Sequence, residues 1–298
     1  MRALVTGGKG FVGTWLAAHL RAEGDEVCSV DHEVDVTDAD AVRAAVIDAA
    51  PDAVYHLAAF THVGKSWSDP GAVLHVNAFG TLRVLEAASA CPTPPRVLLV
   101  SSAEVYGAVD EADLPVSEQA PLMPVTPYAA SKVAAEYLGL QAHLARGLPV
   151  VRVRPFNHVG PGQGPGFVVP SLAERIVGAQ RTGTTSVGIG NLSARRDLTD
   201  VRDVVRAYRL LVEHGEPGQV YNVCSGRALS IRAVAERMLE IADARLELVT
   251  DPTLVRPVDV PVVCGDPTRL KQTTAWSPEI DLDRTLADVL DEWRTRVP

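Results

Sequence analysis

Short apolar runs alternate with longer segments of helical periodicity through the first half of the chain. Runs of this kind, rich in valine and leucine, are typical of strands buried on both faces of a sheet. Five of them stand at residues 3–6, 26–30, 53–57, 96–100 and 150–154. Between them, apolar positions three and four residues apart predict helices over residues 11–23, 39–49, 73–90 and 127–146. This alternation predicts an α/β fold, a doubly wound parallel sheet covered by helices on both faces.

The pattern changes after Pro155. Residues 160–166 hold four glycines and two prolines, the composition of a loop, and helical spacing resumes at Phe167. We expect a ligand-binding loop here; a flexible surface linker is the alternative. A strand at 219–223 and helices at 230–242 and 282–296 follow.

The change of pattern predicts two parts. We expect a dinucleotide-binding domain over residues 1–155, to which residues 190–223 return. A smaller C-terminal substrate domain would then consist of residues 156–189 and 224–298.

Composition narrows the classes of protein that fit. Hydrophobic residues make up 47% of the 298 positions and charged residues 22%, which fits a folded globular chain and excludes disorder. The 28 basic and 37 acidic residues give a net charge of −9, which disfavours a nucleic-acid partner. Neither a signal peptide nor an apolar stretch of membrane-spanning length is evident, and the four cysteines lack metal-binding spacing. We therefore expect a cytoplasmic protein with no metal and no membrane contact.

A glycine pattern joins the first strand to the first helix. Gly7, Gly10 and Gly13 are spaced G-x-x-G-x-x-G, which permits a tight turn and brings a pyrophosphate to the helix N-terminus. Asp31 ends the second strand, where it can accept hydrogen bonds from the adenosine ribose. The pattern predicts a bound dinucleotide; if this is a nicotinamide dinucleotide, Asp31 repels a 2′-phosphate and favours NAD(H). Lys9 could attract that phosphate, so NADP(H) stays open, and an ordinary glycine-rich turn is the alternative.

A second pattern carries acid/base chemistry. Tyr128 and Lys132 are four residues apart at the start of a predicted helix and therefore share one face. A neighbouring Lys⁺ stabilises phenolate, which would let the tyrosine transfer protons below its usual pKa. Ser101 and Ser102 close the fourth strand, where sites on such sheets form, and a hydroxyl there could bond a substrate oxygen. A core tyrosine beside a solvated lysine is the alternative.

With these motifs in place, the chain resembles the extended short-chain dehydrogenases/reductases that act on nucleotide sugars. The motifs that carry the resemblance lie at residues 6–13, 56–59, 76–81, 101–107 and 128–132. Residues 154–163, 196–208 and 256–261 are most similar to GDP-4-keto-6-deoxy-D-mannose reductases, whose close relatives are GDP-mannose 4,6-dehydratases.

The resemblance implies a role for each catalytic candidate. Tyr128 would be the acid/base, Lys132 would lower its pKa and bind the nicotinamide ribose, and Ser102 would orient the sugar C4 oxygen. Glu104 stands where dehydratases of this family keep a glutamate base.

Binding residues follow from the same resemblance. Those implied for the cofactor, besides Tyr128 and Lys132, are Gly7, Gly10, Phe11, Val12, Gly13, Asp31, Asp35, Val36, Leu57, Ala58, Ala59 and Asn77. Those implied for the nucleotide sugar are His62, Ser102, Asn157, Val168, Arg196, Arg256 and Asp259. Asn157, Arg196 and Arg256 would hold the diphosphate, and Asp259 the nucleotide ribose. A structural histidine, a loop-bracing asparagine and a solvated arginine are the alternatives for His62, Asn157 and Arg196.

Several activities are compatible with this framework. The first is reduction of the C4 ketone of a nucleotide 4-keto-6-deoxy sugar, with GDP-4-keto-6-deoxy-D-mannose as the expected substrate. A 4,6-dehydratase is the alternative; Ala103, where many dehydratases carry an acid, counts against it. An epimerase is less favoured by the matching segments. A catalytically silent NAD(P) sensor is disfavoured because Tyr128 and Lys132 are both present.

Relatives of this kind pair two helices from each subunit into a four-helix bundle, so we expect a homodimer. The helices would be those predicted at residues 73–90 and 127–146. Apolar residues with compatible spacing are Leu82, Leu85, Val133, Tyr137 and Leu140. The alternative is that these side chains face the chain's own sheet.

Overall fold

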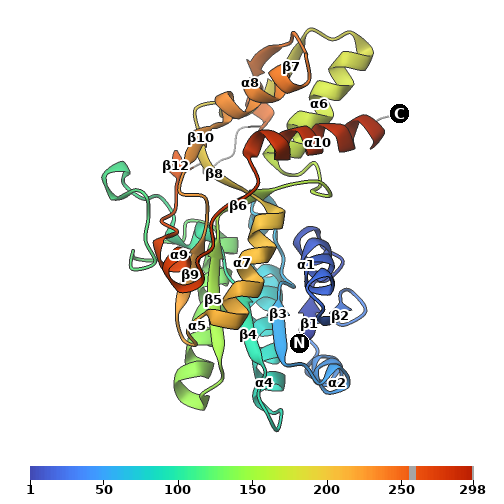
Figure 1. Cartoon of the computed structure of the whole chain (residues 1–298). Coiled ribbons are helices and arrows are strands. Elements are labelled where there is room, and N and C mark those ends of the chain that lie inside the picture. The colour runs from blue at the N-terminus through green and yellow to red at the C-terminus, as the bar shows by residue number, and fades with distance from the viewer. Residues whose placement is uncertain (255–259, 297–298) are drawn as a thin grey trace.

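A six-stranded parallel sheet forms the base of the molecule (Figure 1). This computed structural model describes residues 1–254 and 260–296. The sheet has the order β2-β1-β3-β4-β5-β9, and every pairing in it is parallel. Its strands are β1 (Arg2–Thr6), β2 (Glu26–Val30), β3 (Ala53–His56), β4 (Arg96–Val100), β5 (Val150–Pro155) and β9 (Val220–Val223). The predicted α/β fold class is confirmed, and the order reverses between β1 and β3, where such sheets bind ligands.

Helices cover both faces of this sheet (Figure 1). On one face, α1 (Phe11–Ala22) and α7 (Val201–His214) share an apolar core with the strands. On the other lie α2 (Ala39–Ala49), α4 (Gly80–Ser89) and α5 (Pro127–Arg146). Leu85 is buried in that second core, so its expected place on a dimer surface is wrong: its side chain completes the packing of α4 on its own sheet.

The long helix expected over residues 73–90 is divided in the structure. It consists of α3 (Pro70–Leu74), a π-helical turn at His75–Phe79 and α4. A π turn inserts one residue into the helical repeat and is often found at functional sites. It carries Asn77, whose contacts are described below.

The second half of the chain adds smaller sheets and three helices above the carboxyl ends of the large sheet (Figure 1). One small sheet joins β6 (Asn157–Val159), β8 (Arg195–Asp200), β10 (Ala228–Ser230) and β12 (Val262–Val263). The other pairs β7 (Ser186–Ile189) with β11 (Glu247–Thr250). Helices α6 (Val168–Thr182), α8 (Ile231–Ile241) and α10 (Leu282–Arg296) share a separate apolar core with them, and α9 (Thr268–Thr274) packs beside β9. Short 3₁₀ turns lie at Gly64–Trp67, Ala103–Tyr106, Glu111–Asp113 and Pro252–Leu254.

Candidate active site

The glycine turn between β1 and α1 leaves no room for side chains. A Cβ atom on Gly13 would lie 2.1 Å from Gly7 O, and one on Gly7 would lie 2.9 Å from Ala58 N. Gly7 has φ +71°, a conformation that favours glycine. Gly10 caps α1 without a side-chain hydrogen bond, so the amides of the first turn, which includes Phe11, face a space suited to an anion. The turn therefore fits the pyrophosphate of a dinucleotide.

The end of β2 is tied to this turn by Asp31. Its Oδ2 accepts from Lys9 N at 2.8 Å and its Oδ1 from His32 N at 3.0 Å. Lys9 Nζ donates to Glu33 Oε2 at 2.8 Å. The end of β2 therefore carries two carboxylates, Asp31 and Glu33, and one ammonium group, that of Lys9. This excess of negative charge favours the binding of ribose hydroxyls over that of a 2′-phosphate.

Beyond β2, the candidate residues Asp35 and Val36 lie beside the helical segment that precedes α4. Asp35 Oδ1 accepts from Thr37 N and Thr37 Oγ1 at 2.9 and 2.8 Å, and these bonds lower the pKa of Asp35. A Cβ atom on Gly80 would lie 2.8 Å from Val36 Cγ2, so this glycine permits close packing. Val36 thus packs against the start of α4 and belongs to the core on that face of the sheet.

The residues that follow β3 are held in place by hydrogen bonds around a buried histidine. His56 bonds Thr6 Oγ1 at 2.8 Å and Thr81 Oγ1 at 3.0 Å, and burial lowers its pKa to about 3. Ala58 N donates to the same Thr6 hydroxyl at 3.2 Å. The neutral imidazole thus fixes the segment in which Leu57, Ala58 and Ala59 were predicted to border the adenosine.

Asn77 links that segment to the helix that bears Tyr128. Its Oδ1 accepts from Phe60 N at 2.7 Å, and its Nδ2 donates to Phe60 O at 3.1 Å and to Ser131 Oγ at 2.8 Å. Ser131 Oγ in turn donates to Tyr128 O at 2.7 Å. Since the Asn77 amide is engaged in these bonds, we expect it to act on the cofactor pocket by positioning Phe60 and α5.

Tyr128, Lys132 and Ser102 come together at the carboxyl end of β4. Thr126 Oγ1 caps α5 by accepting from Ala129 N, which places Tyr128 in the first turn. Burial raises the pKa of Tyr128 to about 12; a hydrogen bond with Ser102 opposes this rise and the charge of Glu104 adds to it. The lowering of this pKa expected from Lys132 is therefore not what the structure shows, because the phenol is only 8% exposed and burial dominates.

Lys132 lies one helical turn further along α5. Its Nζ donates to Val100 O, at the end of β4, at 2.7 Å. Burial lowers the pKa of Lys132 to about 8, and the nearby carboxylate of Glu136 opposes the shift.

We expect the activity to depend on the proton of Lys132. If the ammonium form assists Tyr128, kcat/KM for ketone reduction should fall about tenfold per unit above about pH 8, as Lys132 loses its proton. The stability of the fold should instead increase over this pH range. The folded-state pKa lies below the ordinary value of 10.5, so this group's contribution to the free energy of unfolding rises as pH goes from about 8 to 10.5.

A pH–rate profile and urea midpoints between pH 6 and 10 measure both effects. Lys132→Arg, whose guanidinium keeps its charge, should lack the inflection near pH 8 whatever its absolute rate. A wild-type profile that stays flat to pH 10 would contradict the role given to the ammonium group.

A cavity of about 320 Å³ lies between β6, β8 and the start of α6, and Glu104, two residues after Ser102, is part of its wall. It brings together four of the predicted residues, Glu104, Asn157, Val168 and Arg196. His62 lies at its edge, since its Nε2 is 3.5 Å from where a Cβ atom on Gly166 would stand. Arg256 and Asp259 lie outside the residues that the structure describes.

The cavity also has lining residues that the sequence analysis missed. Arg175 and Asn191 both contribute to its wall. Arg175 lies two helical turns beyond Val168 and one beyond Ser171, which also lines the cavity, so helical spacing from the predicted residue Val168 could have identified it. Asn191 follows β7, and its place beside α6 depends on tertiary structure.

Within residues 1–254 and 260–296, no group of three His, Cys, Asp or Glu side chains has the arrangement needed to hold a metal ion. Over the same ranges, no helix combines the length and apolar character required to cross a membrane.

Fold and site together define an extended short-chain dehydrogenase/reductase: a doubly wound parallel sheet, a glycine turn at its switch point, a buried tyrosine and lysine at Tyr128 and Lys132, and a cavity that Glu104 lines. A family model described as GDP-mannose 4,6 dehydratase matches residues 30–289, and the chain belongs to this family.

Individual relatives are similar over nearly the whole chain. It is 41% identical to a GDP-6-deoxy-D-mannose reductase of Pseudomonas aeruginosa, with 99% of this chain and 98% of the relative covered. It is 32% identical to a GDP-6-deoxy-D-talose 4-dehydrogenase of Aggregatibacter actinomycetemcomitans, with 91% and 90% covered. The solved structure of the P. aeruginosa protein RMD complexed with NADPH covers both chains fully, with a TM-score of 0.92 and 39% identity.

Proposed function

We propose that this protein reduces the C4 ketone of a nucleotide 4-keto-6-deoxy sugar with a reduced nicotinamide dinucleotide, and that GDP-4-keto-6-deoxy-D-mannose is the substrate. The observation that carries the proposal is the buried Tyr128 phenol, which is hydrogen-bonded with Ser102 and lies close enough to Glu104, a residue of the cavity wall, to be affected by its charge. The two relatives named above match this chain over nine tenths of its length or more, and the name of each concerns a GDP-linked 6-deoxy sugar.

The chemistry assigned to the chain's own residues is proton transfer at the C4 oxygen. The dinucleotide, when bound, supplies the hydride to C4. Tyr128, whose pKa of about 12 keeps it protonated, donates its proton to the developing alkoxide, which is more basic than a phenolate. Ser102 hydrogen-bonds the same oxygen, and the Lys132 ammonium stabilises the phenolate that Tyr128 leaves behind.

The cavity residues suit the rest of a nucleotide sugar. Arg196 supplies a guanidinium for the diphosphate and Asn157 an amide, while Val168 borders the base. Glu104 reaches the sugar end, because its charge is felt by the Tyr128 phenol. His62, at the rim, contacts the sugar or its diphosphate.

A 4,6-dehydratase is the second candidate, and Glu104 is the observation that favours it. A carboxylate that lines the sugar end of the cavity could remove the C5 proton. Ala103, only 8% exposed, offers no acid to the departing hydroxyl, which favours the reductase. Mass spectrometry of reactions with GDP-mannose and with its 4-keto-6-deoxy derivative separates the two. We expect a gain of two hydrogens on the keto sugar; loss of water from GDP-mannose would support the dehydratase instead.

Within the nicotinamide dinucleotides, we propose that NADH is preferred and NADPH is also used. Glu33 occupies the ammonium of Lys9, and Asp31 lies beside both. We expect kcat/KM for NADH to exceed that for NADPH several-fold, and Glu33→Gln, which releases Lys9, to shift the ratio about threefold to tenfold toward NADPH. Glu26→Gln, an exposed change at the start of β2, is the matched control. A strong wild-type preference for NADPH would contradict the role of Asp31.

We also propose a homodimer through α3, α4 and α5. Large apolar side chains that would otherwise face water on this segment of the chain are Leu74, Phe79, Tyr137 and Leu144. Light scattering at micromolar concentration should give twice the mass of the chain, and Tyr137→Glu should weaken association, because it places a charge in an apolar contact. A monomeric wild type would contradict the proposal.

A further inference from the structure

One peptide of the Gly/Pro loop is held from both sides. Trp15 Nε1, on α1, donates to Pro161 O at 2.8 Å. Gly162 N donates to both carboxylate oxygens of Glu292, on α10, at 3.0 and 2.9 Å. The carbonyl and amide of a trans peptide point in opposite directions. Trp15 and Glu292 therefore bind the same planar peptide from opposite sides.

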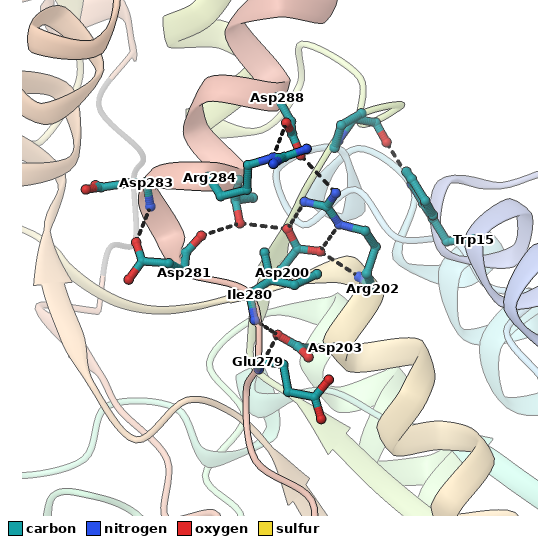
Figure 2. A network of polar contacts seen from close by, with 12 residues as sticks. Trp15, Asp200, Arg202, Asp203, Glu279, Ile280, Asp281, Asp283, Arg284 and Asp288 are labelled. Atoms are coloured by element: carbon teal, nitrogen blue, oxygen red, sulfur yellow. Dashed lines mark hydrogen bonds and ion pairs between the residues drawn. The ribbon is translucent and has the colours of Figure 1, made fainter.

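Trp15 and α10 are themselves joined by a charged network. Arg202, in the first turn of α7, lies with its guanidinium 5.8 Å from the centre of the Trp15 ring. The same guanidinium binds Asp200 at 2.8 and 2.7 Å and Asp288, on α10, at 2.8 Å (Figure 2). Thr285 Oγ1 adds a bond of 2.6 Å to Asp200 Oδ2. The two residues that bind the loop are therefore part of a junction at which α1, α7 and α10 are linked by polar contacts.

The gripped peptide directly precedes one wall of the nucleotide-sugar cavity. Gln163, Pro165 and Gly166 line that cavity. Gly162 has φ +93°, and a Cβ atom on it would lie 3.7 Å from the Phe11 ring, so the loop passes over the first turn of α1. The loop thus lies between the glycine turn and the cavity.

We propose that Trp15 and Glu292 are positioning residues for nucleotide-sugar binding: they fix the Pro161–Gly162 peptide and with it the wall formed by residues 163–166. The inference rests on the proposed function, since it takes the ligand of the cavity to be a nucleotide sugar. A loop released at this peptide must be ordered each time the ligand binds, and that ordering lowers the affinity.

The test is calorimetric binding of GDP and, separately, of NADH to the full chain and its variants. Trp15→Phe and Glu292→Ala should each weaken GDP binding about threefold to tenfold, the loss of one to two hydrogen bonds that hold the wall. Glu292→Ala should leave NADH affinity within about twofold, because the residue lies on a helix outside the glycine turn. If these residues were only structural, their substitution would lower the melting temperature and weaken the binding of GDP and of NADH alike.

Trp276→Phe is a closely matched control. Its Nε1 also donates to a backbone carbonyl, Asp203 O at 3.0 Å, and Arg206 lies 5.9 Å from its ring centre. It makes these contacts away from the loop, so GDP affinity should stay within about twofold. If Glu292→Ala does not fold, Glu292→Gln, which keeps one acceptor for Gly162 N, should show a smaller loss in the same direction.

The outcomes separate the inference from the function on which it rests. If the wild-type protein binds GDP and both Trp15→Phe and Glu292→Ala bind it equally well, the inference alone is overturned. A Trp276→Phe variant that loses as much GDP affinity as Trp15→Phe would also overturn it. Wild-type protein that binds NADH but no GDP would overturn the proposed function, and the inference with it.

Discussion

Tyr128→Phe should reduce kcat/KM for ketone reduction by about 10²–10⁴-fold, the contribution of a positioned general acid. The change removes one oxygen atom and keeps the ring that fills the first turn of α5. Because the phenol is the proton source for the C4 alkoxide, kcat should fall while the affinities for NADH and GDP stay close to those of the wild type. Steady-state kinetics together with calorimetry measure both quantities.

A matched control is Tyr221→Phe. This tyrosine is also buried, and its hydroxyl accepts a hydrogen bond from Glu216 N at 2.9 Å, but it lies in β9. It should cost stability of about 1 kcal/mol and little activity. Near-normal turnover by Tyr128→Phe would refute the assignment of the proton donor.

Glu104→Gln should have the next largest effect, a loss of about tenfold to a hundredfold in kcat/KM. In a reductase no proton leaves C5, so the carboxylate serves only as a hydrogen-bond acceptor for a sugar hydroxyl, a contact worth about 1–3 kcal/mol. The same substitution should also lower the pKa of Tyr128, because the charge that raises it is gone.

Kinetics with the 4-keto sugar measure the loss, and Glu111→Gln, an exposed residue of the following turn, is the control. In a dehydratase the substitution would remove the general base and cost about 10²–10⁴-fold. Wild-type protein that releases water from GDP-mannose, with Glu104→Gln blocking that release, would assign Glu104 as a base and contradict the reductase.

The large sheet was predictable because its strands carry strong local signals. Each of its first five strands is a run of four to six residues in which apolar residues are the majority, and the intervening helices have regular apolar spacing. The smaller sheets include β10 and β12, which have three and two residues, too few for an alternation of apolar and polar positions to distinguish them from loops. Helix α7, which the sequence analysis did not assign, has buried positions at Val204, Tyr208 and Leu211 that follow helical spacing.

The site divides along the same line. Tyr128 and Lys132 are encoded within five residues, and a local motif suffices to find them. The direction of the Tyr128 pKa shift depends on burial by the whole fold, and the expectation drawn from Lys132 alone was wrong. Glu292 lies 130 residues from Gly162, so only the tertiary structure brings that pair together.

The most direct test of the central claim follows hydrogen isotopes through one turnover. The protein is given GDP-4-keto-6-deoxy-D-mannose and NADH deuterated at the transferred position in ordinary water, and then unlabelled NADH in heavy water. A C4 reductase places the cofactor's deuterium at C4 and, in heavy water, leaves C5 unlabelled, because Tyr128 delivers its proton to oxygen. Deuterium from the solvent at C5, dependent on Glu104, would contradict the account and assign the protein to dehydration or epimerisation.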